Sequence, residues 1–128
     1  MDIEAAIARA RGEGRNSLDE ETGKRLLAGS GIAVPKSVVV SGADNAEAAV
    51  AGLRFPVAAK VMSAEILHKS DVGGVKVNLA TPAAVRDAIA AMANAPGIKR
   101  RKVDGYLVEE MAPSGQEVVV GMFRDPQF

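Results

Sequence analysis

The 128-residue chain contains no cysteine, which excludes disulfide bonds, zinc–thiolate centres and a cysteine nucleophile. Aromatic residues are scarce at 3%, so the base-stacking surface of a single-strand nucleic-acid binder is not encoded. Sixteen acidic residues balance sixteen basic ones, and this zero net charge gives no electrostatic reason to expect DNA, RNA or an anionic membrane as a partner. No apolar run reaches the ~18 residues of a membrane helix, and Asp2, Glu4 and Arg9 argue against a secretory signal. We therefore expect a cytoplasmic protein.

The remaining composition is that of an ordinary globular domain. Apolar residues make up 48% of the chain and charged residues 25%, and the length suffices for one core. Periodicity and turn residues predict helices near 3–10, 18–29, 44–53 and 82–93, the third with Asp44 near its N-cap and the fourth capped by Thr81. Strands are predicted at 37–40, 57–62, 75–79, 106–111 and 117–123, and the last two are joined by a turn at 113–115.

This order of elements predicts an α+β (mixed α/β) fold, with helices packed on a largely antiparallel sheet, because two strand–strand junctions imply antiparallel pairs. Residues 1–17 form a leading helix with a glycine-containing linker at 11–16, and residues 18–128 form the main unit. A polar connection is expected at 94–102. The chain closes on Asp125–Phe128 without a terminal cap, so we expect an incomplete unit.

Lys60 is the charged residue of the apolar strand predicted at 57–62. A lysine that a strand holds over a ligand site supplies a fixed cation for phosphate oxygens. The alternative is simple period-two alternation, in which Lys60 faces water. The pattern alone leaves both interpretations open.

The segment His68–Gly74 joins two predicted strands and contains the only histidine of the chain. Paired glycines allow backbone N–H groups to approach phosphate, because no Cβ obstructs them. Lys69 and Ser70 would add a charge and a hydroxyl, and a histidine here can accept or relay a phosphoryl group. The alternative is a polar surface loop whose glycines serve its turn.

A third candidate stretch ends the strand predicted at 106–111. Backbone donors and acceptors at residues 109–112 can read the edge of an adenine ring, and Glu117 beyond the turn can bind ribose hydroxyls. The alternative is the charged end of a hairpin.

Taken in order, these stretches resemble the ATP-grasp region of ADP-forming acyl-CoA synthetases, a family whose best-known activity is acetate–CoA ligase. The matching segments are Gly31–Pro35, Phe55–Lys60, His68–Val75, Leu107–Met111, Glu117–Gly121 and Arg124–Phe128. The resemblance spans about residues 18–128, and its most specific parts are His68–Val75 and the closing Asp-Pro-Gln-Phe. The beta chain of succinyl-CoA synthetase is more distantly similar through Gly73–Val77.

The resemblance implies a role for each matching residue. Lys60 would bind the α and β phosphates of ATP, and Gly73 and Gly74 would belong to a mobile loop that closes over them. Lys24 matches a lysine typical of the family, and His68 matches a loop histidine that passes phosphate to or from the nucleotide. The hinge that receives adenine and the residue that approaches ribose would be Glu109, Glu110, Met111 and Ala112, and Glu117.

The resemblance also implies ATP or ADP and Mg²⁺ as cofactors. The partner would be a CoA-binding domain or subunit of the same enzyme that bears the phosphohistidine. The acidic Mg²⁺ ligands of the family lie in a second subdomain, so we expect none in this chain, which alone would be inactive. Two alternatives remain: the ATP-grasp-like part of a protein acetyltransferase, or a non-catalytic module that binds a ligand or partner.

Overall fold

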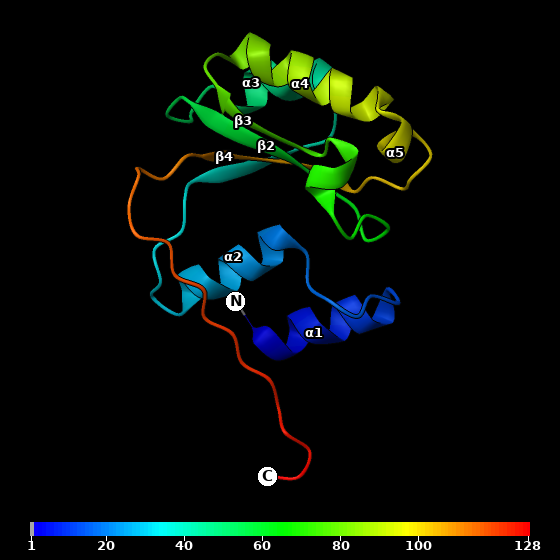
Figure 1. The fold of residues 1–128 in the computed structure, drawn as a ribbon, viewed down its shortest axis with the longest axis vertical. Helices are drawn as coiled ribbons and strands as arrows, with labels where there is room; N and C mark the ends of the chain where they lie inside the picture. Colours follow the sequence, from blue (N-terminus) through cyan, green and yellow to red (C-terminus); the bar gives the residue numbers. More distant parts are fainter. Residues whose placement is uncertain (1) are drawn as a thin grey trace.

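A computed structural model describes residues 2–128. Its helices and strands are interspersed along the chain, as the sequence predicts for a mixed α/β fold (Figure 1). The helices are α1 (Ile3–Gly12), α2 (Glu20–Gly29), α3 (Ala46–Ala49), α4 (Pro82–Asn94) and α5 (Pro96–Lys99), with 3-10 turns η1 (Ala43–Asn45) and η2 (Lys69–Val72). The strands are β1 (Ser37–Val40), β2 (Val57–Met62), β3 (Val75–Leu79) and β4 (Gly105–Glu110). None of these helices is long and apolar enough to cross a bilayer.

The four strands form one sheet in the order β1-β4-β2-β3, and every neighbouring pair is antiparallel. The predicted α+β class with a largely antiparallel sheet is therefore confirmed. In the β2–β4 register Ala58 lies opposite Glu109 and Lys60 opposite Leu107. Because side chains alternate between the two faces of a strand, Lys60 and Glu109 project from the same face of the sheet.

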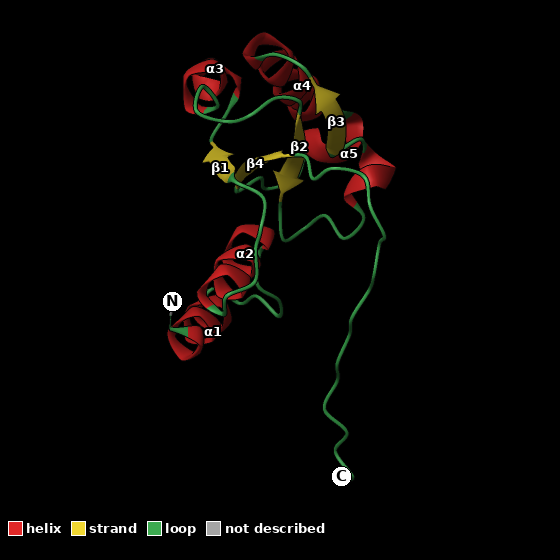
Figure 2. Cartoon of the chain, turned by 90° about the vertical axis from the view of Figure 1, so that its left-hand side faces the viewer, coloured by secondary structure: helices red, strands yellow, loops and turns green. Residues whose placement is uncertain are grey.

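Helices lie on both sides of this sheet (Figures 1 and 2). Helices α3 and α4 cover one face, and α1 and α2 lie on the opposite side. The hydrophobic core fills the space between the sheet and the α3–α4 layer; its most buried side chains include Val40, Val50, Val57, Val61, Val85, Ile89, Met92 and Val108. The face toward α2 instead carries charged side chains, so the two faces of the sheet differ in chemistry.

Three helices begin at capping residues that satisfy one of their first backbone N–H groups. In α1 the Asp2 carboxylate accepts a hydrogen bond from the Ala5 N–H at 3.2 Å. The Asp19 carboxylate accepts a hydrogen bond from the Thr22 N–H at 2.7 Å, which starts α2. The Thr81 hydroxyl accepts one from the Ala84 N–H at 3.1 Å, as predicted, and Pro82 follows at the first helical position. These caps fix the residues at which α1, α2 and α4 begin.

Three predicted boundaries are wrong. Helix α1 continues to Gly12, into the segment predicted as a linker. The helix predicted to reach residue 53 ends at Ala49, and Asp44 lies in η1 instead of capping it. The turn that follows α3 is fixed by the Glu110 carboxylate, which accepts a hydrogen bond from the Arg54 N–H at 2.7 Å. The polar connection predicted at 94–102 contains α5, because Ile98 is 1% exposed and packs into the core.

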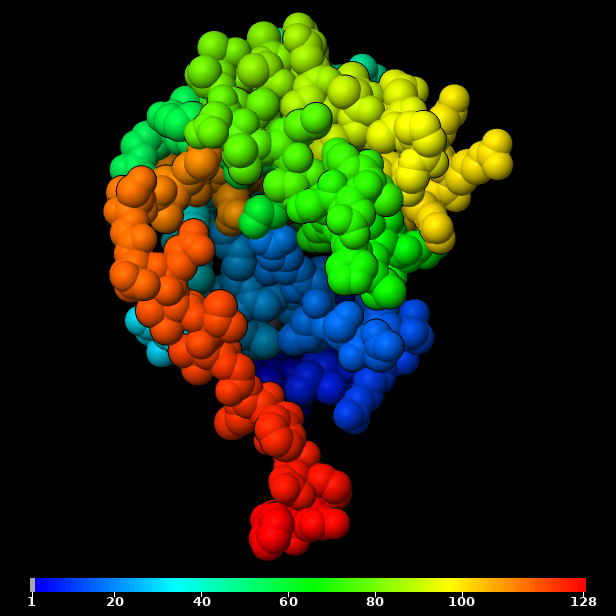
Figure 3. Space-filling view, in the orientation of Figure 1, coloured from blue at the N-terminus to red at the C-terminus, as the bar shows by residue number. Residues whose placement is uncertain are grey.

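The strand predicted at 117–123 is also wrong. Residues 112–128 contain no strand, and the apolar side chains there are exposed, Val119 to 96%. A hairpin strand must pair with the strand before it, yet both sides of β4 are already occupied by β1 and β2. The segment therefore runs along the outside of the molecule and projects from it (Figure 3).

Candidate functional site

Five charged side chains meet between α2 and the sheet, and we call them the lysine–glutamate cluster: Glu20, Lys24, Lys60, Lys69 and Glu109. Lys60 Nζ lies 2.7 Å from Glu20 Oε1 and 2.6 Å from Glu109 Oε1. Lys69 Nζ donates to Glu20 Oε2 at 3.2 Å, and Lys24 Nζ donates to Glu109 Oε2. Helix α2, β2, η2 and β4 each supply at least one member, so the cluster exists only in the folded chain.

The cluster stabilises the charged form of its members. Burial raises the pKa of Glu20, but hydrogen bonds and the charges of Lys60 and Lys69 outweigh it and leave this pKa below its ordinary value. Burial likewise raises the pKa of Glu109, and Lys24 and Lys60 reverse the shift. For Lys60, burial lowers the pKa, and Glu109 and Glu20 together raise it above its ordinary value. All three groups are therefore ionised near neutral pH.

The position of Lys60 excludes the interpretation in which its side chain simply faces water. Residues on both sides of it in β2 are buried, and its own side chain is 25% exposed and points at α2. Lys60 therefore does not simply face water. It is an ammonium that Glu20 and Glu109 hold over one face of the sheet.

The two glycines shape the turn that delivers Lys69. Gly73 has φ +73°, a left-handed conformation that favours glycine. A Cβ on Gly74 would lie 2.5 Å from Val61 Cγ1 and 2.9 Å from the Lys69 carbonyl oxygen. The Gly74 N–H donates to the Lys69 carbonyl at 2.7 Å, and the Gly73 N–H donates to the Ser70 carbonyl at 3.3 Å. In this structure both N–H groups are bonded within the turn instead of pointing at a ligand.

Residues 109–112, the stretch expected to form an adenine hinge, do not share one environment. The Glu109 side chain belongs to the cluster and the residue is 9% exposed, so it is not the exposed end of a hairpin. Glu110 bonds to the Arg54 N–H, and its own N–H donates to the Lys36 carbonyl at 2.9 Å. Met111 Sδ accepts a hydrogen bond from the Asn78 N–H at 3.3 Å, and Ala112 is exposed.

Two expected site residues lie apart from the cluster. His68 is exposed and directly precedes η2, so it neighbours Lys69 in sequence without joining its ion pair. Glu117 is exposed in the segment after β4, and within residues 2–128 its side chain makes no ion pair. In the same described part of the chain, no group of three or more His, Asp or Glu side chains is placed to hold a metal ion.

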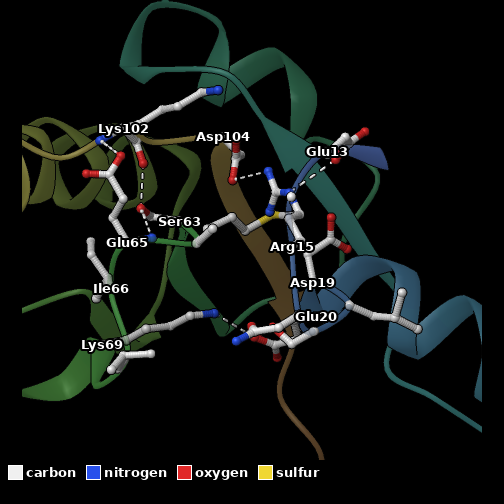
Figure 4. Close-up of a pocket in the computed structure, with 17 residues that line it drawn as sticks. Glu13, Arg15, Asp19, Glu20, Ser63, Glu65, Ile66, Lys69, Lys102 and Asp104 are labelled. Carbon is white, nitrogen blue, oxygen red and sulfur yellow. Dashed lines mark hydrogen bonds and ion pairs between the residues drawn. The ribbon is translucent and has the colours of Figure 1, made fainter. Parts of the chain in front are cut away.

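A polar cavity of about 540 Å³ opens beside the cluster (Figure 4). Glu20 and Lys69 both line it and are hydrogen-bonded to each other at its wall. Its other walls include Arg15, which lies 2.9 Å from Asp104, and residues 62–67. Its volume is within the range of ~300–1,000 Å³ that ligand sites occupy. The cavity thus gives a small polar ligand access to one side of the lysine–glutamate cluster.

Sequence reasoning missed Glu20. An acidic residue in the first turn of a helix is common, because it complements the helix dipole, so nothing in its local sequence marked it. Its contact with Lys60 joins residues 40 positions apart, which local patterns do not encode.

Comparisons with known proteins show the family of this chain. Residues 9–128 match the ATP-grasp domain family. The beta subunit of acetate–CoA ligase (ADP-forming) I from Pyrococcus furiosus is 38% identical over 124 residues, which are 95% of this chain and 53% of that protein. The 4-hydroxybutyrate–CoA ligase (ADP-forming) of Nitrosopumilus maritimus is 38% identical over 118 residues, 91% of this chain and 17% of that protein. The chain thus spans about half or less of the curated relatives it matches.

A solved structure shows the same fold. ACD1 from Ca. Korarchaeum cryptofilum in complex with coenzyme A superimposes with a TM-score of 0.88 and 38% identity, over 97% of this chain and 54% of that one. A second structure, of acetyl-coenzyme A synthetase 1 from the same organism, contains coenzyme A and Mg-AMPPCP, with a phosphohistidine segment pointing towards the nucleotide-binding site. Its TM-score is 0.75, with 36% identity over 97% of this chain and 52% of that one. This chain belongs to the ATP-grasp domain family.

Proposed function

We propose that this chain is the nucleotide-side subdomain of an ADP-forming acyl-CoA synthetase, an acid–thiol ligase. Such an enzyme interconverts an acid, CoA and ATP with acyl-CoA, ADP and phosphate, and it carries the phosphoryl group on a histidine. Residues 18–128 would form the subdomain, and a second subdomain would complete the nucleotide site. Support comes from relatives that are ADP-forming CoA ligases and from the solved relative with a nucleotide analogue. We expect the enzyme to work in the cytoplasm.

One observation carries this proposal. Lys60 projects from a central strand of the sheet, half-buried, and its ammonium already holds anionic oxygens at 2.6–2.7 Å. Those distances are typical of the charge-assisted hydrogen bonds that lysine makes with phosphate. The residues present therefore fit a phosphate-bearing ligand over this face of the sheet.

Other residues would take roles around this phosphate site. Lys24 would orient Glu109 and thereby Lys60, since it binds the other oxygen of the same carboxylate. The Gly73-Gly74 turn would close over the phosphates once the hydrogen bonds from its two N–H groups to the Ser70 and Lys69 carbonyls break. The backbone at Met111 and Ala112, with Glu109 and Glu110 before it, would receive adenine, and Glu117 would reach ribose when the segment after β4 folds back.

The remaining parts of the reaction would come from other segments. Mg²⁺, when bound with ATP, offsets the charge of the phosphates, and its acidic ligands would belong to the second subdomain. The phosphohistidine would belong to the CoA-binding domain or subunit. His68, exposed beside η2, is open to such a partner and would relay the phosphoryl group.

The test is a titration of the ¹⁵N-labelled chain with Mg-ATP, followed by amide chemical shifts, which detect millimolar binding. Shifts are expected near Lys60, Gly74 and Met111. Lys60→Met should weaken binding at least tenfold, because a hydrogen bond to a charged group contributes about 1.5–3 kcal/mol. Lys99→Met is the matched control, since this exposed lysine of α5 carries the same charge and forms no ion pair with the cluster.

Binding that disappears with Lys60→Met and persists with Lys99→Met would support the proposal. An absence of shifts at these amides in the unaltered chain would contradict it, as would equal binding by both variants.

A further inference from the structure

The Glu20 carboxylate is shared between two ammonium groups. Lys60 Nζ binds its Oε1 at 2.7 Å, and Lys69 Nζ binds its Oε2 at 3.2 Å. Each oxygen thus has its own lysine, one from β2 and one from η2. Two lysines arranged around one small anion are also the arrangement that binds a phosphate group, whose oxygens each accept such hydrogen bonds.

We propose that Glu20 occupies the position of a phosphate group between Lys60 and Lys69, and that a nucleotide phosphate binds by displacing this carboxylate. The identity of the phosphate as part of a nucleotide rests on the function proposed above. The pair of lysines and the internal anion between them rest on the structure alone. Lys69 thereby becomes the second phosphate-binding cation of the site.

Burial and ion-pair partners distinguish Glu109, the fixed carboxylate, from Glu20, the displaceable one. Glu109 lies in the central strand β4, is 9% exposed, and also pairs with Lys24, which forms no ion pair with Glu20. The Glu20 side chain is 30% exposed, and both of its partners are the lysines in question. Three lysines and two glutamates give the cluster one net positive charge. Without Glu20 it has two, which matches the roughly two negative charges of a terminal phosphate.

The cavity gives the phosphate a way in and the carboxylate a way out. Glu20 and Lys69 both line the volume of about 540 Å³, so an anion can reach the lysine pair without the sheet opening (Figure 4). Because Glu20 borders open volume, rotation about its own side-chain bonds can remove the carboxylate from the lysines. Helix α2 can then stay capped by Asp19.

The experiment measures binding of tripolyphosphate, Mg-ATP and adenosine to the full chain by calorimetry at low salt. Glu20→Gln keeps the size of the side chain and removes its charge. Glu21→Gln is the matched control, because Glu21 is 31% exposed on the same turn of α2 and faces Arg25. Lys69→Met removes the second cation. Thermal unfolding of each variant verifies that it is folded.

We expect Glu20→Gln to bind tripolyphosphate about tenfold more tightly than the unaltered chain, because the competing internal ion pair is gone. Glu21→Gln should stay within about twofold, and Lys69→Met should bind about tenfold more weakly. Equal affinities of Glu20→Gln and Glu21→Gln would overturn the proposal. So would unchanged binding by Lys69→Met, or a Glu20→Gln variant that binds no tripolyphosphate.

The three ligands separate this inference from the proposed function. If Glu20→Gln binds tripolyphosphate more tightly and neither it nor the unaltered chain binds Mg-ATP, the lysine pair is supported and the nucleotide site is contradicted. Lys60-dependent Mg-ATP binding that Glu20→Gln leaves unchanged would support the nucleotide site and refute the displaced carboxylate.

Discussion

Replacing Gly74 by alanine tests whether the turn before β3 is fixed by close packing. The new Cβ would lie 2.5 Å from Val61 Cγ1 and 2.9 Å from the Lys69 carbonyl oxygen. Neither neighbour can yield easily, because Val61 is fully buried and the Lys69 carbonyl accepts the hydrogen bond of Gly74 itself. Overpacking of this kind costs about 1–3 kcal/mol. Because one of the two clashes is with a backbone carbonyl oxygen, which cannot move aside as a side chain can, we expect Gly74→Ala to lower the free energy of unfolding by about 2–3 kcal/mol.

Chemical and thermal denaturation measure this loss. For 128 residues, an unfolding entropy of ~2.1 cal/mol/K per residue makes each kcal/mol about 4 °C, so the Tm should fall by about 8–12 °C. Gly52→Ala is the matched control, since no atom lies within 4 Å of its added Cβ, and it should change stability by less than about 0.5 kcal/mol. A Gly74→Ala loss no larger than that of the control would refute the packing argument.

Two further predictions concern the cluster and the segment after β4. Because the pKa values of Glu20 and Glu109 lie below 4.5, the unfolded chain binds more protons than the folded chain just below that pH. The free energy of unfolding should therefore fall as the pH decreases below 4.5. Measured by urea unfolding, this fall should be shallower in a Glu20→Gln/Glu109→Gln variant. Parallel curves for the two proteins would contradict the lowered pKa values. Amides of residues 113–124 should exchange with solvent almost unprotected, because no strand pairs with them, and slow exchange measured by NMR would reveal a strand there.

The sheet could be predicted wherever local signals coincide. The strand at 57–62 follows Pro56 and the strand at 75–79 follows Gly74, and both have the predicted bounds. The cap at Thr81 was likewise evident, because threonine before proline satisfies a helix start. Local chemistry decides these elements, so the sequence is sufficient for them.

Tertiary context decides the elements that were missed. The valines at 118–120 favour a strand, but a strand needs an open edge, and β1 and β2 occupy both edges of β4. Helix α5 is too short for periodicity to reveal, and Ile98 forms it by packing into the core. Among the expected site residues, Lys60, Lys24 and Glu109 come together, but Glu20 joins them through a contact that only the folded chain makes.

The position of β4 in the sheet has a consequence for how the protein is made. Among strands β1–β4, β4 is synthesised last, and it lies between β1 and β2. Neither β1 nor β2 can therefore pair with β4 until residue 110 has left the ribosome. The β2–β3 pair and α4 can form earlier, because their contacts lie closer in sequence. During synthesis β1 therefore remains an unpaired strand for some seventy residues, about 4–14 s at ~5–20 residues per second, before the sheet closes late.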